Sequence, residues 1–168
     1  MQPHQTSSDI ARNSSPYTIR PARLDEHRVL EAIQRNASLV WEDTRAALLA
    51  HPDACDIPLE HLSDGQCCVA EYENTAVGFC IALPVDDGYL EIDGLFVEPA
   101  HWRKGIGRAL LDFVESKARA EQIQALQVIA NPNALWFYLT FGFEIIGDHP
   151  TAFGPAFAMW KPLWVIAR

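Results

Sequence analysis

Two glycines and four basic side chains are concentrated in one short part of an otherwise acidic chain. The segment reads Arg103-Lys-Gly-Ile-Gly-Arg108, and His101 stands just before it. If a helix begins here, its first turn presents unpaired N–H groups and a partial positive charge, which suit a phosphate. Glycine also lets an anion approach the backbone without a Cβ in the way. The segment therefore predicts a pyrophosphate-binding turn.

The residues on either side of this turn have the spacing of a strand followed by a helix. Before the turn, Leu90, Ile92 and Leu95-Phe-Val97 suit a buried strand, which Glu98-Pro99 ends. After the turn, apolar residues recur at helical intervals up to about Ala120. These are Ile106, Leu110, Phe113 and Val114. A strand, a turn and a helix thus carry the candidate phosphate site.

Two carboxylates, Glu91 and Asp93, interrupt the apolar strand and lie on the same face because a strand has a period of two. If these side chains are buried, the pKa of a carboxyl group there rises, which makes it a base able to deprotonate an ammonium group, directly or through water. The alternative is a solvated strand face, on which Tyr89 and Glu91 are simply exposed. A bulge is expected at Gly94, beside Asp93. Both carboxylates are candidate bases, and the sequence does not choose between them.

The remaining patterns predict an α/β fold with a sheet of mixed direction. Strands are expected at Tyr17–Arg20, Cys67–Tyr72, Ala76–Leu83, Ala125–Ile129, Phe143–Ile146 and Ala156–Trp160. Helices are expected from Asp25, with Val29, Leu30, Ile33 and Ala37 on one face, from Trp41 to Ala50, and from a cap at Asn133 through Phe141. Residues 53–64 predict a loop with some helix. Residues 1–15 predict a flexible tail, and 16–168 a single domain.

Composition restricts the class of protein further. The net charge of -9 argues against a nucleic-acid binder, and no apolar run is long enough for a membrane span. The four cysteines (Cys55, Cys67, Cys68 and Cys80) have no metal-ligand spacing, and neither do the histidines, so no metal site is predicted. Cys67 and Cys68 should point to opposite faces of a strand. We interpret these thiols as reduced core residues of a cytoplasmic protein.

The order of motifs narrows the kind of phosphate site. A Walker A loop has no match, and the third glycine of a dinucleotide fingerprint is replaced by Leu110. The strand Leu95-Phe-Val97, an acid–Pro pair and Arg103-Lys-Gly-Ile-Gly-x-Ala-Leu-Leu111 are followed by Asn131-x-x-Ala-x-x-x-Tyr-x-x-x-Gly-Phe143. Together these motifs resemble the GNAT superfamily of acyl-CoA-dependent N-acetyltransferases. The resemblance covers about Tyr17 to Pro162.

This resemblance implies the GNAT fold: a mostly antiparallel sheet of about seven strands, splayed in the middle and flanked by about four helices. It implies acetyl-CoA as the acyl donor, with its pantetheine arm along the strand and its pyrophosphate at the turn. The implied cofactor-binding residues are Leu95, Phe96, Val97, Trp102, Arg103, Lys104, Gly105, Ile106, Gly107, Arg108, Asn131 and Asn133. The family usually has Gln or Arg where Trp102 stands, so a side-chain contact there is in doubt. Of Asn131 and Asn133, the sequence leaves open which one contacts the cofactor.

The resemblance also implies a reaction, in which an amine attacks the thioester directly. Tyr138 occupies the position of the family's general acid, although an aromatic residue on a short helix is equally suited to the core. The helices of residues 25–50 and the loop His149–Pro155 are expected to face a primary amine acceptor. The competing hypothesis is a non-catalytic acyl-CoA-binding regulatory or partner domain, and a third is a site for another nucleotide. GNAT relatives are often dimers, so a homodimer is a further expectation.

Overall fold

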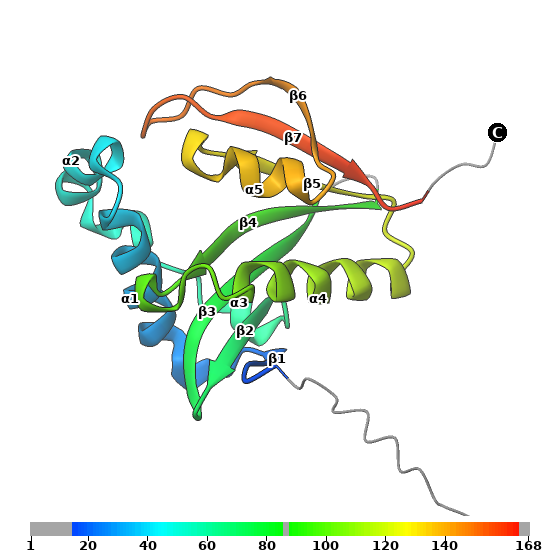
Figure 1. Ribbon diagram of the computed structural model, residues 1–168, viewed down its shortest axis with the longest axis horizontal. Helices are drawn as coiled ribbons and strands as arrows, with labels where there is room; N and C mark the ends of the chain where they lie inside the picture. Colours follow the sequence, from blue (N-terminus) through cyan, green and yellow to red (C-terminus); the bar gives the residue numbers. More distant parts are fainter. Residues whose placement is uncertain (1–14, 86–87, 165–168) are drawn as a thin grey trace, which may run out of the picture.

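Seven strands form one sheet in the order β1-β2-β3-β4-β5-β7-β6 (Figure 1). The computed structural model describes residues 15–85 and 88–164. Within these ranges β4 and β5 are parallel neighbours, and the other neighbouring strands are antiparallel. The strands are Thr18–Pro21 (β1), Cys67–Tyr72 (β2), Thr75–Val85 (β3), Tyr89–Val97 (β4), Ala125–Ala130 (β5), Glu144–Asp148 (β6) and Phe157–Pro162 (β7). The predicted mixed, mostly antiparallel sheet is confirmed.

Helices cover both faces of this sheet. They are His27–Leu39 (α1), Glu42–Ala50 (α2), Glu60–Ser63 (α3), Ile106–Ala120 (α4) and Leu135–Thr140 (α5). Alternate residues of β2 enter two different cores, because successive side chains of a strand point to opposite faces. Cys67 and Val69 pack beneath α1, whereas Cys68 and Ala70 pack beneath α4. The two adjacent cysteines therefore do face apart, and all four cysteines are buried and free.

The predicted elements differ from the structure in a few places. Val29 was expected on the buried face of α1 but is 43% exposed, since Leu30, Ile33 and Ala37 already define that face. The single helical turn α3 lies inside the segment that predicted a loop with some helix. Residues 1–14 of the predicted tail lie outside the described residues. Among the helices of the described ranges, none has the length and apolarity to cross a bilayer.

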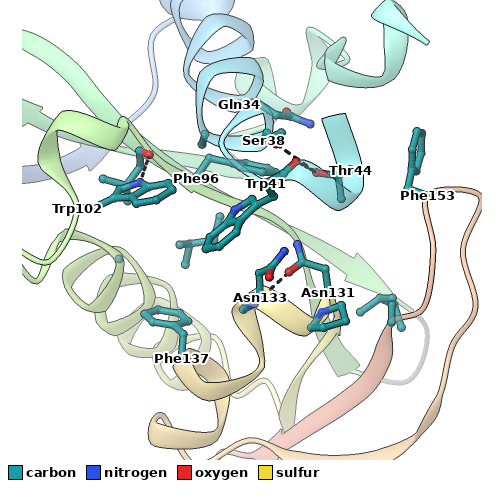
Figure 2. A pocket seen from close by; sticks show the side chains of 18 of the residues that line it. Gln34, Ser38, Trp41, Thr44, Phe96, Trp102, Asn131, Asn133, Phe137 and Phe153 are labelled. Atoms are coloured by element: carbon teal, nitrogen blue, oxygen red, sulfur yellow. Dashed lines mark hydrogen bonds between the residues drawn. The ribbon is translucent and has the colours of Figure 1, made fainter. Parts of the chain in front are cut away.

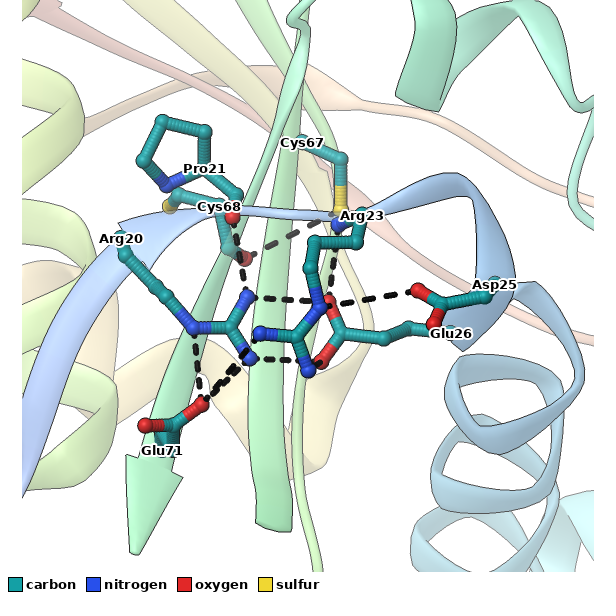
Figure 3. Close-up of polar contacts among 8 residues, drawn as sticks. All are labelled: Arg20, Pro21, Arg23, Asp25, Glu26, Cys67, Cys68 and Glu71. Carbon is teal, nitrogen blue, oxygen red and sulfur yellow. Dashed lines mark hydrogen bonds and ion pairs between the residues drawn. The ribbon is translucent and has the colours of Figure 1, made fainter. Parts of the chain in front are cut away.

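An ion-pair network fixes the start of α1 to the edge of the sheet (Figure 3). Arg20 of β1 donates to Glu26 and to Glu71 of β2, with both N–O distances at 2.6 Å. Glu26 is 7% exposed and also accepts a hydrogen bond from the backbone N–H of Arg23. The hydrogen bonds from Arg20 hold the pKa of Glu26 below its usual range, so this carboxylate stays charged. The network thereby positions a helix that forms one wall of the functional site.

Candidate functional site

Strands β4 and β5 pair at first and then separate. Their pairing ends at Ile92 and Val128, although β4 continues beside β3 to Val97 and β5 continues beside β7. The register between β3 and β4 shifts at Asp93, so a bulge marks the point of separation. Beyond the bulge, the alternation of the β3–β4 ladder leaves the backbone N–H and C=O groups of Leu95 and Val97 facing away from β3. The splayed sheet thus presents a short free strand edge.

A cavity of about 840 Å³ lies against this free edge (Figure 2). Its walls come from α1 and α2, the end of β4, the turn before α4, the segment after β5, and the loop between β6 and β7. Its labelled lining residues in Figure 2 are Gln34, Ser38, Trp41, Thr44, Phe96, Trp102, Asn131, Asn133, Phe137 and Phe153. The helices and the aromatic loop that were expected to face an acceptor both line it. Segments far apart in the sequence therefore enclose one space.

The first turn of α4 opens onto this cavity. Its N-cap residue, Gly105, has φ +79°, and in the structure no side chain caps the helix. The N–H groups of Ile106, Gly107 and Arg108 have no partner within the helix, because it begins at Ile106. A Cβ added at Gly107 would meet the ring of Phe137 at 3.3 Å, whereas one added at Gly105 would meet no atom within 4 Å. Gly105 therefore provides the turn conformation and an open approach, while Gly107 provides close packing.

The residues predicted to hold the cofactor gather around this opening. All of them except Lys104 line the cavity, and Lys104 is exposed beside it. Arg103 and Arg108 are exposed, and the nearest ion pair of Arg108 is to Asp112 at 3.8 Å. Asp43 is the one carboxylate among the described lining residues. Positive charge thus collects at the α4 end of the cavity in an acidic chain.

Trp102 has a role that the sequence did not predict. Its indole N–H donates to the backbone oxygen of Val97 at 2.7 Å. Its ring stacks on Trp41, with the ring centroids 5.7 Å apart and the planes inclined by 19° (Figure 2). Trp102 stands where the family usually has Gln or Arg. Its two contacts hold the turn before α4 against the end of β4 and against Trp41 at the start of α2. It also occupies the acceptor group of Val97, which leaves both backbone groups of Leu95 free on the strand edge.

The two asparagines after β5, Asn131 and Asn133, have different surroundings. Asn131 Oδ1 accepts a hydrogen bond from the backbone N–H of Ala134 at 3.0 Å, so Asn131 is the cap of the short 3-10 turn Pro132–Ala134. The prediction that Asn133 caps this helical segment was therefore wrong. The reason is the 3-10 turn, which moves the cap two residues earlier than a direct α-helical start would. Asn133 is exposed and lines the cavity.

Tyr138 lies behind the cavity wall. Its side chain is 5% exposed and is not among the lining residues. Its ring packs edge-on against Phe137 and Phe143, with centroids 5.1 Å and 5.3 Å away. Burial raises the pKa of this phenol well above its ordinary value. Phe137, which the Tyr138 ring contacts, lines the cavity whereas Tyr138 does not, so the role of this tyrosine as an acid stays a prediction.

Glu91 and Asp93 have different surroundings. Glu91 is half-buried, and its carboxylate accepts a hydrogen bond of 3.5 Å from the side-chain amide Nε2 of Gln127 on the neighbouring strand β5. Asp93 is exposed at the bulge and lines a second, smaller chamber beside the main cavity. Neither carboxylate lines the main cavity, and the deep burial assumed in the sequence argument is absent at Asp93.

Several lining residues carried no motif in the sequence. Gln34, Ser38, Trp41 and Thr44 come from α1 and α2, whose apolar spacing already accounts for those helices as core elements. The feature that could have singled out Trp41 is a large aromatic residue at a predicted helix start, and it is 37% exposed in the structure. Tryptophan is enriched at binding surfaces, because its large apolar ring also carries a hydrogen-bond donor.

A family comparison agrees with this geometry. The model of the Acetyltransferase (GNAT) family matches residues 28–143, which extend from α1 to the end of the α5 segment. The chain belongs to the GNAT acetyltransferase family. The matched region contains the splayed strands, the turn before α4 and both asparagines.

One curated protein and several solved structures are similar to this GNAT chain. Human N-acetyltransferase 8 is 36% identical over 107 residues, which are 57% of this chain and 47% of that protein. The chain thus spans about half the length of this curated relative. A GCN5-related N-acetyltransferase from Rhodopseudomonas palustris has a TM-score of 0.73 at 23% identity, covering 86% of this chain and 94% of its own. PaiA N-acetyltransferase from Thermoplasma acidophilum, in complex with coenzyme A, has a TM-score of 0.72 at 19% identity. The match covers 87% of this chain and 98% of that chain. At these identities the two structures show the shared fold.

Proposed function

We propose that this protein is an acetyl-CoA-dependent N-acetyltransferase that acetylates a primary amine by direct attack on the thioester. One observation carries the proposal: the free edge of β4 and the uncapped N-terminus of α4 open onto the same cavity. A strand edge offers backbone pairing to an amide-containing chain, and a helix N-terminus offers N–H groups to a pyrophosphate. Their combination fits coenzyme A, whose pantetheine arm and pyrophosphate need these two kinds of partner.

The proposed cofactor contacts follow from the groups that remain free. The N–H groups of the first turn of α4 bind the pyrophosphate, and Arg103 and Lys104 add positive charge. Leu95 supplies its backbone C=O and Val97 its backbone N–H for the pantetheine arm, because Trp102 already occupies the Val97 carbonyl. Asn133 is the better candidate of the two asparagines, since the side-chain oxygen of Asn131 is committed to its cap.

In the proposed transfer, the neutral amine forms the new C–N bond to the acetyl carbon as the C–S bond breaks. The backbone N–H of Leu95, beside the bulge, polarises the acetyl oxygen. Glu91 or Asp93 takes the proton that leaves the amine, directly or through water, and Tyr138 provides the proton that the sulfur gains. Tyr138 is buried and does not line the cavity, so its hydroxyl group must move, or its neighbours must rearrange, before it reaches the sulfur.

Direct attack is also favoured by the state of the one cysteine among the described lining residues. Cys55 lines the cavity and is 1% exposed. Burial raises the pKa of its thiol, so Cys55 stays protonated near neutral pH. A protonated thiol is a poor nucleophile, and a covalent acetyl-Cys55 intermediate is therefore not proposed.

Turnover with a panel of amines tests the proposal. Release of free coenzyme A should depend on the amine, and Tyr138→Phe and Glu91→Gln should each lower kcat by about 10²–10⁴-fold if they transfer protons. The control is Tyr89→Phe, which changes a half-buried tyrosine on β4 that lies outside both described cavities. If acetyl-CoA is consumed no faster with any amine than in buffer, the enzyme reading fails and a non-catalytic acyl-CoA-binding domain replaces it.

Binding tests the choice of nucleotide separately. Coenzyme A at a hundredfold excess over its Kd should stabilise the protein by about 2.7 kcal/mol. For a chain of this size, that corresponds to a rise in Tm of roughly 5–10 °C. ATP and NAD at equal concentration should give no comparable rise. A larger shift with either of them would favour a site for another nucleotide.

A further inference from the structure

One part of the main cavity is lined mainly by apolar side chains. Its lining residues come from α1, α2, the 3-10 turn Pro52–Cys55 and the loop of residues 149–156, and we call this part the acceptor side. Two of them, Trp41 and Phe153, carry large rings that are partly exposed. Four others are each at most 6% exposed and form a buried apolar surface: Ala37, Leu48, Cys55 and Ala156.

The two rings lie near opposite ends of α2. Trp41 immediately precedes the helix, and the ring of Phe153 meets the ring of His51, which immediately follows it, edge-on with the centroids 6.3 Å apart. At 1.5 Å per residue, the nine residues of α2 span about 13 Å. Figure 2 shows both rings around the same cavity. The cavity therefore has an aromatic side chain at each end of its α2 wall.

The acceptor side carries little charge. Among the described lining residues, Asp43 is its one charged side chain, and it is exposed on the first turn of α2. The basic lining residues, His101, Arg103 and Arg108, belong to the turn before α4 and to α4 itself. A carboxylate on the body of an acceptor therefore has no cation to pair with here, and a polycation has one carboxylate.

The threonine hydroxyl groups of the acceptor side are already used by the protein. Thr44 Oγ1 donates to two backbone oxygens, both at 3.2 Å. Thr151 Oγ1 donates to a backbone oxygen of its own turn at 2.9 Å and accepts from a backbone N–H at 3.2 Å. Gln34 and Ser38 are the other neutral polar side chains of this part. A ligand with many polar groups would thus lose its water here without enough new partners.

We propose that the acceptor is a primary amine with an apolar, ring-sized body and no second charge, so that arylalkylamines are preferred substrates. The inference rests on the proposed N-acetyltransferase function. The body packs between Trp41 and Phe153 and covers the buried apolar surface beside them. Burial of apolar area favours this binding, and contacts between aromatic rings add to it. The amine then extends toward the free edge of β4, where the thioester lies.

Three matched probes test the inference by calorimetry with the full chain and saturating coenzyme A. Ethylamine lacks the ring of phenylethylamine, whereas phenylalanine keeps the ring and adds a carboxylate. A single methylene group in an apolar pocket is worth about 10–200-fold, so phenylethylamine should bind at least about a hundredfold more tightly than ethylamine. Because its carboxylate has no cation to pair with, phenylalanine should bind at least about tenfold more weakly than phenylethylamine.

Substitution of Phe153 connects this preference to the acceptor side. Phe153→Ala should lower the affinity for phenylethylamine about tenfold and leave the affinity for ethylamine unchanged. Phe153→Leu keeps an apolar side chain and should retain most of the affinity. The control is Trp136→Ala, which removes an aromatic side chain that is 76% exposed and outside both described cavities, and it should bind like the wild type.

Equal affinities of the wild-type protein for phenylethylamine and ethylamine would overturn the inference. So would phenylalanine binding as tightly as phenylethylamine, or an undiminished affinity in Phe153→Ala. The same ratios in kcat/KM provide a second readout. If amines are acetylated without a preference for the ring, this inference fails and the proposed function stands. If no amine is acetylated, the proposed function fails, while calorimetry still decides whether the acceptor side binds an apolar amine.

Discussion

Replacing Gly105 with alanine isolates the conformational demand of the turn before α4. Gly105 has φ +79°, and a Cβ built on it meets no atom within 4 Å. The cost of the substitution is therefore the left-handed backbone of an L-residue, about 1–2 kcal/mol, with no steric contribution from neighbours. For a chain of this size each kcal/mol lowers Tm by about 2–4 °C, so a loss of roughly 2–8 °C is expected if the turn keeps its form.

The same free energy can appear in ligand binding instead. If the substituted turn relaxes in the free protein, coenzyme A must restore the left-handed conformation when it binds. Stability then changes little, and the affinity for coenzyme A falls by a factor of about 5–30, which corresponds to 1–2 kcal/mol. Urea unfolding without ligand and calorimetry with coenzyme A measure the two parts, and their sum should be about 1–2 kcal/mol.

Two further glycine variants make this test specific. Gly147→Ala also adds a Cβ into open space, but Gly147 lacks a positive φ, so both readouts should stay near the wild-type values. Gly105→Asn should fall between wild type and Gly105→Ala, because asparagine tolerates the left-handed region better than alanine does. Equal behaviour of Gly105→Ala and Gly147→Ala would refute the conformational argument.

Three other predictions concern contacts that hold the elements around the cavity in place. Glu26→Gln should cost about 1.5–3 kcal/mol in urea unfolding at pH 7, while Asp25→Asn, at a highly exposed acid, changes little. Because the pKa of Glu26 is lowered in the folded state, this contribution is present above the ordinary pKa of about 4.3 and is lost as the pH falls through the lowered one. Trp102→Phe should lose about 1 kcal/mol of stability with the N–H donor, and Trp102→Ala more, since the stack on its partner is lost as well. Asn131→Ala should lower stability by about 1 kcal/mol through its cap, whereas Asn133→Ala should weaken coenzyme A binding at unchanged stability.

The elements with strong local patterns were predictable from the sequence. The apolar spacing of β4 and α4 defines both elements, and glycine at the helix start identified the turn between them. Gly107 shows the limit of that reasoning. The space that a Cβ would occupy at Gly107 adjoins the ring of Phe137 and is not left open for an anion. Only the tertiary structure places Phe137 there.

The arrangement of the site depends on contacts between distant segments, which local patterns do not encode. The separation of β4 from β5 begins where the register of β4 against β3 shifts. The stack of Trp41 on Trp102 joins the start of α2 to the turn before α4. His61 and Asp56 come from a segment that predicted a loop with some helix, and both line one chamber with Asp93 of β4. Tyr138 shows that a motif position can fall behind the wall of a cavity.

The initial rate of coenzyme A release by the wild-type protein, measured with and without amine, tests the central claim most directly. An acetyl-CoA-dependent N-acetyltransferase should release the thiol at a rate that rises and saturates with amine concentration, with one acetylated amine formed for each thiol released. A rate that stays at the level of buffer hydrolysis with every amine, in a protein that binds coenzyme A, would contradict the account.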